Sequence, residues 1–198
     1  NQYGYSKDIK YLHKILKNTG GKATLNAGDG GTTLRFALAY LCLRTEQTTY
    51  LMGSDRLAQR PIDPLIWALT KLGFKIDKNG PDNPFPIGIH PVHVEDLKHK
   101  TSIDCSQSSQ FASALILIAS SMPNGLILEL KGSIVSRSYI EMTLQTLQRS
   151  GLPFTRKNGL IDFQGDGEYR AIPCIPRDWS AAAFFYGFAA LLPGTSLK

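Results

Sequence analysis

The sequence lacks the features on which several protein classes depend. Its three cysteines, Cys42, Cys105 and Cys174, are far apart and contain no CxxC pair, so nothing indicates a disulfide framework or a thiolate metal site. No N-terminal segment reads as a signal peptide, and the longest apolar runs, such as 181–192, are well short of the ~20 residues that span a bilayer. These absences predict a cytoplasmic protein that does not engage a membrane.

Motifs for common hydrolytic and cofactor chemistry are missing as well. The histidines have no metal-ligand spacing beside carboxylates or cysteines, and we expect them at the surface: His13, His90, His93 and His99. There is no Ser-His-Asp set, no P-loop and no dinucleotide fingerprint. Nucleophilic hydrolysis, nucleotide hydrolysis and hydride transfer therefore have no support in the sequence.

Charge of one sign is not concentrated anywhere in the chain. A formal charge of +6 and a pI near 9.2 suit nucleic acid, an anionic membrane or small anionic substrates, since all three draw on the same electrostatic attraction. The basic residues are scattered, however, and no zinc-finger spacing or Lys- and Arg-rich recognition helix is present. Nucleic acid is therefore disfavoured as a partner.

What the chain does have is internal repetition. At 198 residues and 42% hydrophobic content it is long enough to bury one substantial core. Three segments pair Asp with a Phe seven positions later, at offsets of 75 and 74 residues: 29–36, 104–111 and 178–185. The helices predicted there, 33–43, 110–119 and 181–192, are apolar almost all the way round, so we expect them to be fully buried.

A second kind of helix has apolar positions spaced by three and four ahead of a glycine. Its three copies are Ile9, Leu12, Leu16 and Gly20; Ile62, Leu65, Leu69 and Gly73; and Ile140, Thr143, Leu147 and Gly151. Each copy predicts a half-exposed helix that ends in a left-handed glycine cap. Strand-like segments lie between the helices at 48–52, 74–76, 126–130 and 160–163, and the proline-rich stretch 80–91 predicts a loop.

The predicted unit is strand, buried helix, strand, amphipathic helix, strands, which is an α/β (α+β) fold class. Buried helices with sheets outside them invert the usual layering, in which helices cover a parallel sheet. Pro173 and Pro176 mark a boundary before the third buried helix. We therefore expect one domain over 1–172 and the start of a second over 173–198.

Two helix starts are suited to binding anions. Backbone N–H groups and the positive end of the helix dipole are exposed over 30–33 and 106–109. Glycine there lets a ligand approach the backbone, and serine and threonine add hydroxyl donors. The alternative is ordinary capping, in which Asp29 and Asp104 satisfy the amides of their own helices. Repetition weakens this alternative without removing it.

Two arginines stand near these starts. Arg35 begins an otherwise apolar helix, where a guanidinium is costly to bury unless it pairs with a ligand or with a carboxylate such as Asp29. Arg60 precedes Pro61, which favours the first turn of a helix, so Arg60 is expected in the loop before that helix, either solvated or bound to a ligand. A third group, suited to an anionic hydroxylated ligand, precedes the last amphipathic helix: Ser136, Arg137 and Tyr139.

These segments resemble the 5-enolpyruvylshikimate-3-phosphate (EPSP) synthases, or 3-phosphoshikimate 1-carboxyvinyltransferases, of the enolpyruvyl transferase family. The resemblance rests on Gly-Gly-Thr-Thr-Leu-Arg at 30–35, Arg-Pro-Ile at 60–62, Ser-Ser-Gln-Phe at 108–111 and Val-Ser-Arg-Ser-Tyr-Ile at 135–140. It implies βαβαββ units around a pseudo-threefold axis, with helices inside. The family has two such domains, and by this resemblance the chain holds the end of one unit, two full units and the first helix of the second domain.

The implied reaction transfers the enolpyruvyl group of phosphoenolpyruvate to the 5-hydroxyl of shikimate 3-phosphate and releases phosphate, as a step of aromatic amino-acid biosynthesis. The resemblance implies a monomer that needs neither a metal nor another cofactor. It assigns shikimate 3-phosphate to Ser108, Ser109, Gln110, Ser136 and Tyr139, phosphoenolpyruvate to Gly31, Arg60 and Gln110, and a supporting role to Arg35 and Asp178.

The chain departs from the family pattern in two ways. Asp29 stands where the family has Asn, and because its charge is unfavourable beside a phosphate we expect it to point into the helix cap. The family's N-terminal Lys and Arg ligands, and the proton-transferring Asp and Glu of its second domain, have no counterpart here. We therefore expect no catalytic residue in these 198 residues, weak binding of shikimate 3-phosphate at best, and no turnover.

Two other interpretations remain open. UDP-N-acetylglucosamine enolpyruvyl transferase shares the architecture, but it uses a cysteine in the loop before the Arg-Pro helix, and 53–59 contains none. A basic repeat domain that binds a partner or RNA is an alternative of another class. Binding to RNA would weaken steeply with ionic strength, which would identify it.

Overall fold

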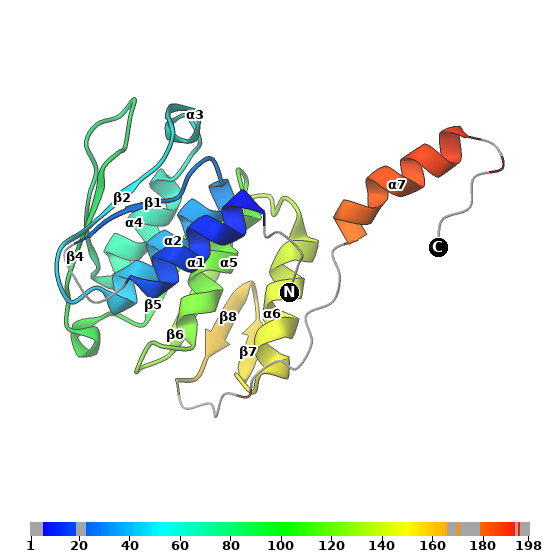
Figure 1. The fold of residues 1–198 in the computed structure, drawn as a ribbon. Helices are drawn as coiled ribbons and strands as arrows, with labels where there is room; N and C mark the ends of the chain where they lie inside the picture. The colour runs from blue at the N-terminus through cyan, green and yellow to red at the C-terminus, as the bar shows by residue number, and fades with distance from the viewer. Residues whose placement is uncertain (1–5, 19–22, 166–169, 171–178, 193, 195–198) are drawn as a thin grey trace.

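The computed structural model describes residues 6–18, 23–165, 170, 179–192 and 194. Figure 1 shows a body of helices and strands from which one helix, α7 (Trp179–Leu191), stands apart. The body begins with α1 (Lys7–Lys17), and two units of the same element order follow it. The repetition seen in the sequence is therefore a repetition of structure.

Each unit has the order β-α-β-α-β-β. The first unit comprises β1 (Thr24–Asn26), α2 (Gly31–Arg44), β2 (Thr49–Met52), α4 (Asp63–Leu72), β3 (Lys75–Asp77) and β4 (Ile87–His90). The second comprises β5 (Lys100–Asp104), α5 (Ser109–Ala119), β6 (Leu126–Lys131), α6 (Arg137–Arg149), β7 (Phe154–Lys157) and β8 (Leu160–Phe163). A short helix, α3 (Asp55–Ala58), interrupts the predicted loop 53–59, and a 3₁₀ turn, η1 (Val94–Asp96), links the units.

The two sheets have the same strand order, β1-β2-β4-β3 and β5-β6-β8-β7. In each, the first two strands run parallel and the others pair antiparallel. The predicted strands 48–52, 74–76, 126–130 and 160–163 are confirmed within one or two residues. The α/β fold class is confirmed.

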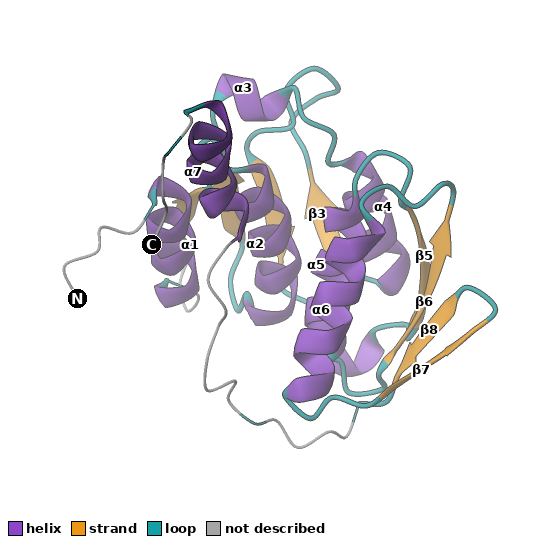
Figure 2. Cartoon of the chain, turned by 90° about the vertical axis from the view of Figure 1, so that its right-hand side faces the viewer, coloured by secondary structure: helices purple, strands orange, loops and turns teal. Residues whose placement is uncertain are grey.

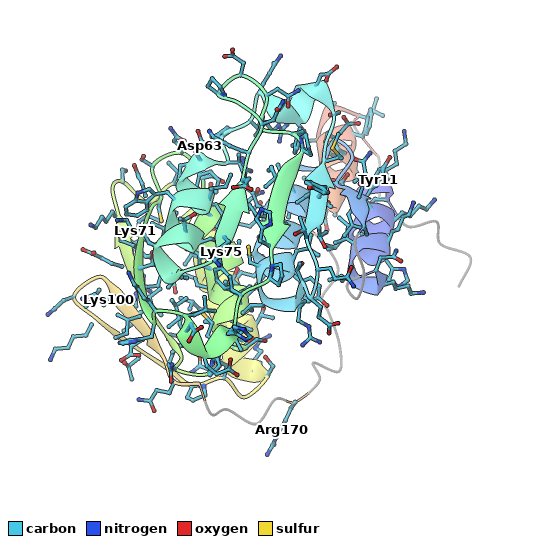
Figure 3. All side chains as sticks on the ribbon, turned by 90° about the vertical axis from the view of Figure 1, so that its left-hand side faces the viewer. Tyr11, Asp63, Lys71, Lys75, Lys100 and Arg170 are labelled. Atoms are coloured by element: carbon cyan, nitrogen blue, oxygen red, sulfur yellow. The ribbon has the colours of Figure 1, made fainter. Side chains whose placement is uncertain are left out.

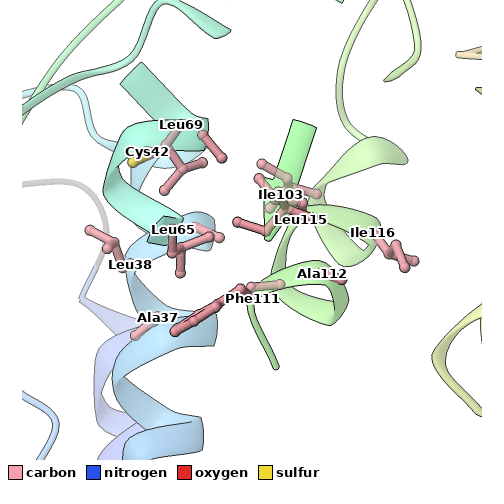
Figure 4. Packing of buried hydrophobic residues seen from close by; sticks show 14 of the residues in the cluster. Ala37, Leu38, Cys42, Leu65, Leu69, Ile103, Phe111, Ala112, Leu115 and Ile116 are labelled. Carbon is pink, nitrogen blue, oxygen red and sulfur yellow. The ribbon is translucent and has the colours of Figure 1, made fainter. Parts of the chain in front are cut away.

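The buried helices α2 and α5 pack against each other. Figure 2 shows the second sheet along one flank of the body, with α5 and α6 on its inner side. Figure 4 shows the core between α2, α4 and α5, where Leu38 of α2, Leu65 of α4 and Leu115 of α5 converge. All three side chains are 0% exposed. The prediction that 33–43 and 110–119 are helices is confirmed, and most of their side chains are buried, but they are not fully buried, because Leu117 is 37% exposed and Phe36, Tyr40 and Leu43 are only partly buried.

The second kind of helix matches its prediction in two of three copies. In α4 the apolar positions are buried and Gly73 ends the helix at φ 109°, and in α6 Gly151 follows the helix at φ 95°. The first copy is wrong in part, because Ile9 and Leu16 of α1 are 50% and 41% exposed. Since α1 packs chiefly against α2 and β1, only a narrow face centred on Ile15 is covered. Gly20 lies outside the described residues.

The proline-rich stretch 80–91 is not wholly a loop, because β4 runs through it. Ile87 and Ile89 are 0% exposed, and β4 pairs with both β2 and β3. The prolines flank this strand without entering it, so every residue of β4 keeps its N–H for the ladder. His90, expected at the surface, is half-buried and hydrogen-bonds to Thr48 (3.2 Å) and Asp77 (2.6 Å).

The prediction that 181–192 is fully buried is wrong in this chain. Phe184 and Phe188 of α7 are 76% and 65% exposed, because no described element packs closely against the helix (Figure 1). The proline boundary 173–176, Asp178 and Cys174 lie outside the described residues. No helix in the described part of the chain is long and apolar enough to cross a membrane.

Candidate functional site

The functional segments gather where parallel strands end. Strands β1 and β2 lie side by side, as do β5 and β6, so the segments that follow each pair leave the same edge of a sheet. Backbone hydrogen bonds join these segments, from Ser54 N to Gly28 O (3.1 Å) and from Val135 N to Cys105 O (3.4 Å). The topology thus places Arg60 near the start of α2, and Ser136 near the start of α5.

Neither aspartate caps its helix, which corrects the capping interpretation. The N-cap of α2 is Gly30, with no side-chain hydrogen bond, and Asp29 is exposed. The N-cap of α5 is Ser108, whose hydroxyl accepts from Gln110 N at 3.2 Å. Asp104 instead accepts from Ser106 N at 2.8 Å. Hydrogen bonds from the Ser106 side chain and then from its backbone N–H hold the pKa of Asp104 below the usual range. The helices begin at Gly31 and Ser109 and not directly after the aspartates, so neither aspartate is the residue that precedes its helix.

Two guanidinium groups face the start of α2. A Cβ added at Gly31 would lie 3.0 Å from Nη1 of Arg60 and 3.3 Å from Nη1 of Arg35, so glycine is what lets both groups approach the backbone. Among the described residues no carboxylate forms an ion pair with either arginine. Burial and the positive charge of Arg60 both lower the pKa of Arg35. Two positive charges this close repel each other, and an anion beside them would offset that repulsion.

Arg35 hydrogen-bonds to Gln110 of the second unit and to Pro61 of its own unit, and not to Asp29. Its Nη1 donates to Oε1 of Gln110 at 2.6 Å, and its Nη2 donates to the Pro61 carbonyl at 2.9 Å. The guanidinium carbon lies 4.9 Å from the centre of the Phe111 ring. Only 6% of Arg35 is exposed, and its Nε is buried without a hydrogen-bond partner. The alternative in which Arg35 pairs with Asp29 is therefore wrong.

Arg60 is exposed in the segment between α3 and α4, as predicted, although Pro61 is not in the first helical turn. Helix α4 begins at Asp63, and Pro64 occupies its first turn instead. Arg60 borders an open cavity of about 340 Å³ that is also lined by Asp63, Lys78 and Asp82. The Arg60 side chain thus lies beside Gly31 and next to an open cavity that a ligand could enter.

Hydroxyl groups dominate the second half of the site. Ser109 is 5% exposed in the first turn of α5. Ser136 precedes α6 in the left-handed region (φ 52°, ψ 46°) and makes no side-chain capping bond. A serine rarely adopts this conformation, which costs energy and is found at functional positions. Tyr139 follows one turn later and is 52% exposed.

Helices α5 and α6 are joined by a buried polar contact. The Thr143 hydroxyl hydrogen-bonds to the Ser113 hydroxyl at 3.0 Å and to the Tyr139 carbonyl at 2.8 Å. This contact aligns the start of α6 with the start of α5, and hence Ser136 and Tyr139 with Ser109. Thr143 stands where the helical pattern calls for an apolar residue, and that irregularity was the signal that could have revealed it.

The structure groups the predicted residues into two adjoining sets. One holds Gly31, Arg35, Arg60 and Gln110, and the other holds Ser108, Ser109, Ser136 and Tyr139. Gln110 belongs to both, because it directly follows Ser109 and its Nε2 donates to Thr32 Oγ1 at 2.9 Å. Thr32 belongs to the helix start 30–33 that the sequence indicated, but its contact with Gln110 was not predicted. Asp178 lies outside the described residues.

Basic side chains elsewhere are dispersed. Figure 3 shows Lys71, Lys75 and Lys100 on one face, projecting from α4, β3 and β5. Groups of three or more His, Cys, Asp or Glu side chains placed to hold a metal ion are absent from the described residues. Cys42 and Cys105 are buried free thiols, and burial raises the pKa of Cys105 to about 11. The two sets around Gln110 are therefore the candidate functional site among the described residues.

Comparison with known proteins agrees with this geometry. The family model described as EPSP synthase (3-phosphoshikimate 1-carboxyvinyltransferase) matches residues 9–197. The 3-phosphoshikimate 1-carboxyvinyltransferase of Bacteroides fragilis strain ATCC 25285 is 34% identical over 198 residues, which cover 96% of this chain and 46% of the relative. That of Pyrococcus abyssi is 38% identical over 168 residues, covering 84% of this chain and 38% of the relative.

The solved structure of EPSP synthase from Acinetobacter baumannii superimposes with a TM-score of 0.64 at 21% identity, covering 85% of this chain and 36% of that one. This likeness shows the fold. The chain spans about half the length of the curated relatives it matches, 46% for both Bacteroides fragilis proteins. With the family model matching nearly all of the chain, the chain belongs to the EPSP synthase family.

Proposed function

We propose that this chain supplies one side of an EPSP synthase active site. The whole protein then transfers the enolpyruvyl group of phosphoenolpyruvate to the 5-hydroxyl of shikimate 3-phosphate. The observation that carries the proposal is the pair of guanidiniums at Gly31, without an acidic partner in the described chain and linked through Gln110 to the serines of α5. A buried cation of this kind is stable when an anion neutralises it.

Each set of residues fits one substrate. Gly31 and Arg60 combine a helix N-terminus with an exposed cation, which suits the phosphate and carboxylate of phosphoenolpyruvate. Ser108, Ser109, Ser136 and Tyr139 offer hydroxyl donors, which suit the phosphate and ring hydroxyls of shikimate 3-phosphate. Gln110 lies between the two sets and contacts both substrates.

In the first step the 5-hydroxyl gives up its proton, its oxygen bonds to C2 of phosphoenolpyruvate, and C3 takes up a proton to become a methyl group. In the second step the bond from C2 to the phosphate oxygen breaks, phosphate leaves, and C3 loses a proton, which restores the double bond. The described residues bind and neutralise the reacting anions. We propose that the proton-transferring groups come from the remainder of the full-length protein, so that this chain alone binds shikimate 3-phosphate weakly and turns over nothing.

We further propose that 1–172 form one domain and that 173–198 begin a second. The exposed apolar surface of α7 supports this division, because a helix that is apolar all round is stable when protein covers it. We propose a cytoplasmic monomer that uses no metal or other cofactor. Two free thiols in the described residues are in keeping with a reducing compartment.

Titration of the chain with shikimate 3-phosphate, followed by ¹⁵N NMR, tests the proposal. We expect weak, saturable binding that Ser109→Ala reduces about tenfold or more, because a hydrogen bond to a charged group contributes about 1.5–3 kcal/mol. Ser121→Ala is the matched control, since Ser121 is exposed just beyond the other end of α5. Absence of binding, or equal affinity in Ser109→Ala and the control, would contradict the assignment.

A further inference from the structure

We infer that Arg35 is a positioning residue that sets both Gln110 and the Arg60–Pro61 segment, and so couples the two halves of the site. The inference rests on the proposed function, since it takes Gln110 and Arg60 as groups that contact substrate. It adds a defined role for a side chain that is itself only 6% exposed.

The guanidinium of Arg35 is held at both ends. One terminal nitrogen donates to Gln110 of α5 and the other to the Pro61 carbonyl, next to Arg60. The guanidinium carbon between them lies over the Phe111 ring, 4.9 Å from its centre. A planar group fixed by two hydrogen bonds and a ring has little freedom to rotate. Arg35 therefore fixes where the segment that carries Arg60 lies relative to the start of α5.

Arg35 also determines which way the amide of Gln110 is turned. A guanidinium can only donate, so the amide oxygen must face it and the amide nitrogen must face away. The nitrogen then donates to Thr32 Oγ1 at 2.9 Å, and its second N–H is left for a ligand. Gln110 thus offers a donor to a phosphate or carboxylate oxygen. Without Arg35 the amide is free to turn and offer an acceptor instead, which an anion repels.

The bond joins equivalent positions of the two units. Arg35 and Gln110 are 75 residues apart, which is the repeat offset, and each precedes the phenylalanine of its own motif, Phe36 or Phe111. Helices α2 and α5 pack together, so this contact lies where the two repeats meet. A displacement of either helix start is transmitted to the other through one hydrogen-bonded pair.

Arg35 is placed for support and Arg60 for direct contact. Both terminal nitrogens of Arg35 are engaged within the protein, whereas Arg60 is exposed beside Gly31 and makes no ion pair with a described residue. Truncating Arg35 should therefore weaken the binding of a ligand that it does not touch. That effect should depend on Gln110.

The test measures the side-chain NH₂ signals of Gln110 and the affinity for shikimate 3-phosphate in a double-mutant cycle of Arg35→Met and Gln110→Ala. We expect Arg35→Met to shift the Gln110 NH₂ signals without ligand and to lower affinity about tenfold, and to have no further effect in the Gln110→Ala background. Arg44→Met, in the last turn of the same helix, is the control and should change neither quantity. If Arg35→Met lowers the folded fraction, Arg35→Lys, which keeps the charge and loses the planar fork, replaces it.

Unchanged Gln110 signals in the Arg35 variant overturn the inference whether or not the ligand binds. Additive losses in the double variant overturn it as well, because they indicate a general loss of structure. A wild-type chain that does not bind shikimate 3-phosphate contradicts the proposed function instead, and the ligand-free Gln110 signals still decide the role of Arg35.

Discussion

The two units share one topology, but they begin their buried helices with different chemistry. Helix α2 begins at glycines faced by two guanidiniums, with no side-chain cap. Helix α5 begins at serines, one of which caps it, and its neighbour α6 adds a strained serine. We therefore propose that the scaffold fixes where an anion binds and that the side chains at each helix start decide which anion it is.

Truncation of Phe111, which is buried between the α2 helix of the first unit and the α5 helix of the second, should have the largest effect on stability. Phe111 is 0% exposed and lies under Arg35 between α2 and α5 (Figure 4). Phe111→Ala should lower the free energy of unfolding by about 3–5 kcal/mol, because it leaves a cavity in the core. Urea denaturation measures the change. Leu117→Ala, at a position 37% exposed on the same helix, should cost much less, and similar losses in the two variants would refute the burial of Phe111 between α2 and α5.

Removal of Arg60 should weaken the binding of one ligand much more than that of the other. Arg60→Ala deletes the exposed cation beside Gly31, so affinity for phosphoenolpyruvate should fall about 10- to 100-fold while affinity for shikimate 3-phosphate changes far less. Isothermal titration with each ligand measures both. Arg56→Ala, exposed in α3, is the matched control. Equal weakening of both ligands would mean that Arg60 acts through folding or through overall charge.

Disruption of the α5–α6 contact should give the smallest effect. Thr143→Val keeps the shape of the side chain but removes its hydrogen bonds to Ser113 and the Tyr139 carbonyl. The free energy of unfolding should fall by about 1 kcal/mol. Shikimate 3-phosphate should also bind more weakly, because Ser136 and Tyr139 are no longer held in position. Thr146→Val, one turn further along α6, provides the comparison. An unchanged affinity would show that α6 is positioned by its apolar face alone.

Much of the fold was predictable because it follows from local patterns. The repeat offset, the two kinds of helix and the caps at Gly73 and Gly151 follow from periodicity and from the conformational freedom of glycine. Strand β4 was missed because its pairing with β2 and β3 is a tertiary effect that outweighs the flanking prolines.

The sequence predicted which segments form the candidate site, but not which side chains contact one another there. The motif positions lie around the helix starts, as expected, and their roles in binding substrate stay predictions. The partners of Arg35 could not be deduced from local sequence, since one lies 75 residues away and the other is a backbone carbonyl. The capping alternative could not be decided from the sequence, because the exact helix starts depend on how each loop leaves its strand. Helix α7 shows a further limit, because an apolar pattern predicts that a helix is covered without telling what covers it.

The central claim is that one repeated scaffold holds two different anions at two helix starts. Backbone amide shifts of a single ¹⁵N-labelled sample, titrated first with phosphoenolpyruvate and then with shikimate 3-phosphate, test it most directly. The account predicts that phosphoenolpyruvate perturbs 30–35 and Arg60, and that shikimate 3-phosphate perturbs 108–111 and 136–139, with Gln110 responding to both. Perturbation of one common set by both ligands, or of neither set, would contradict it.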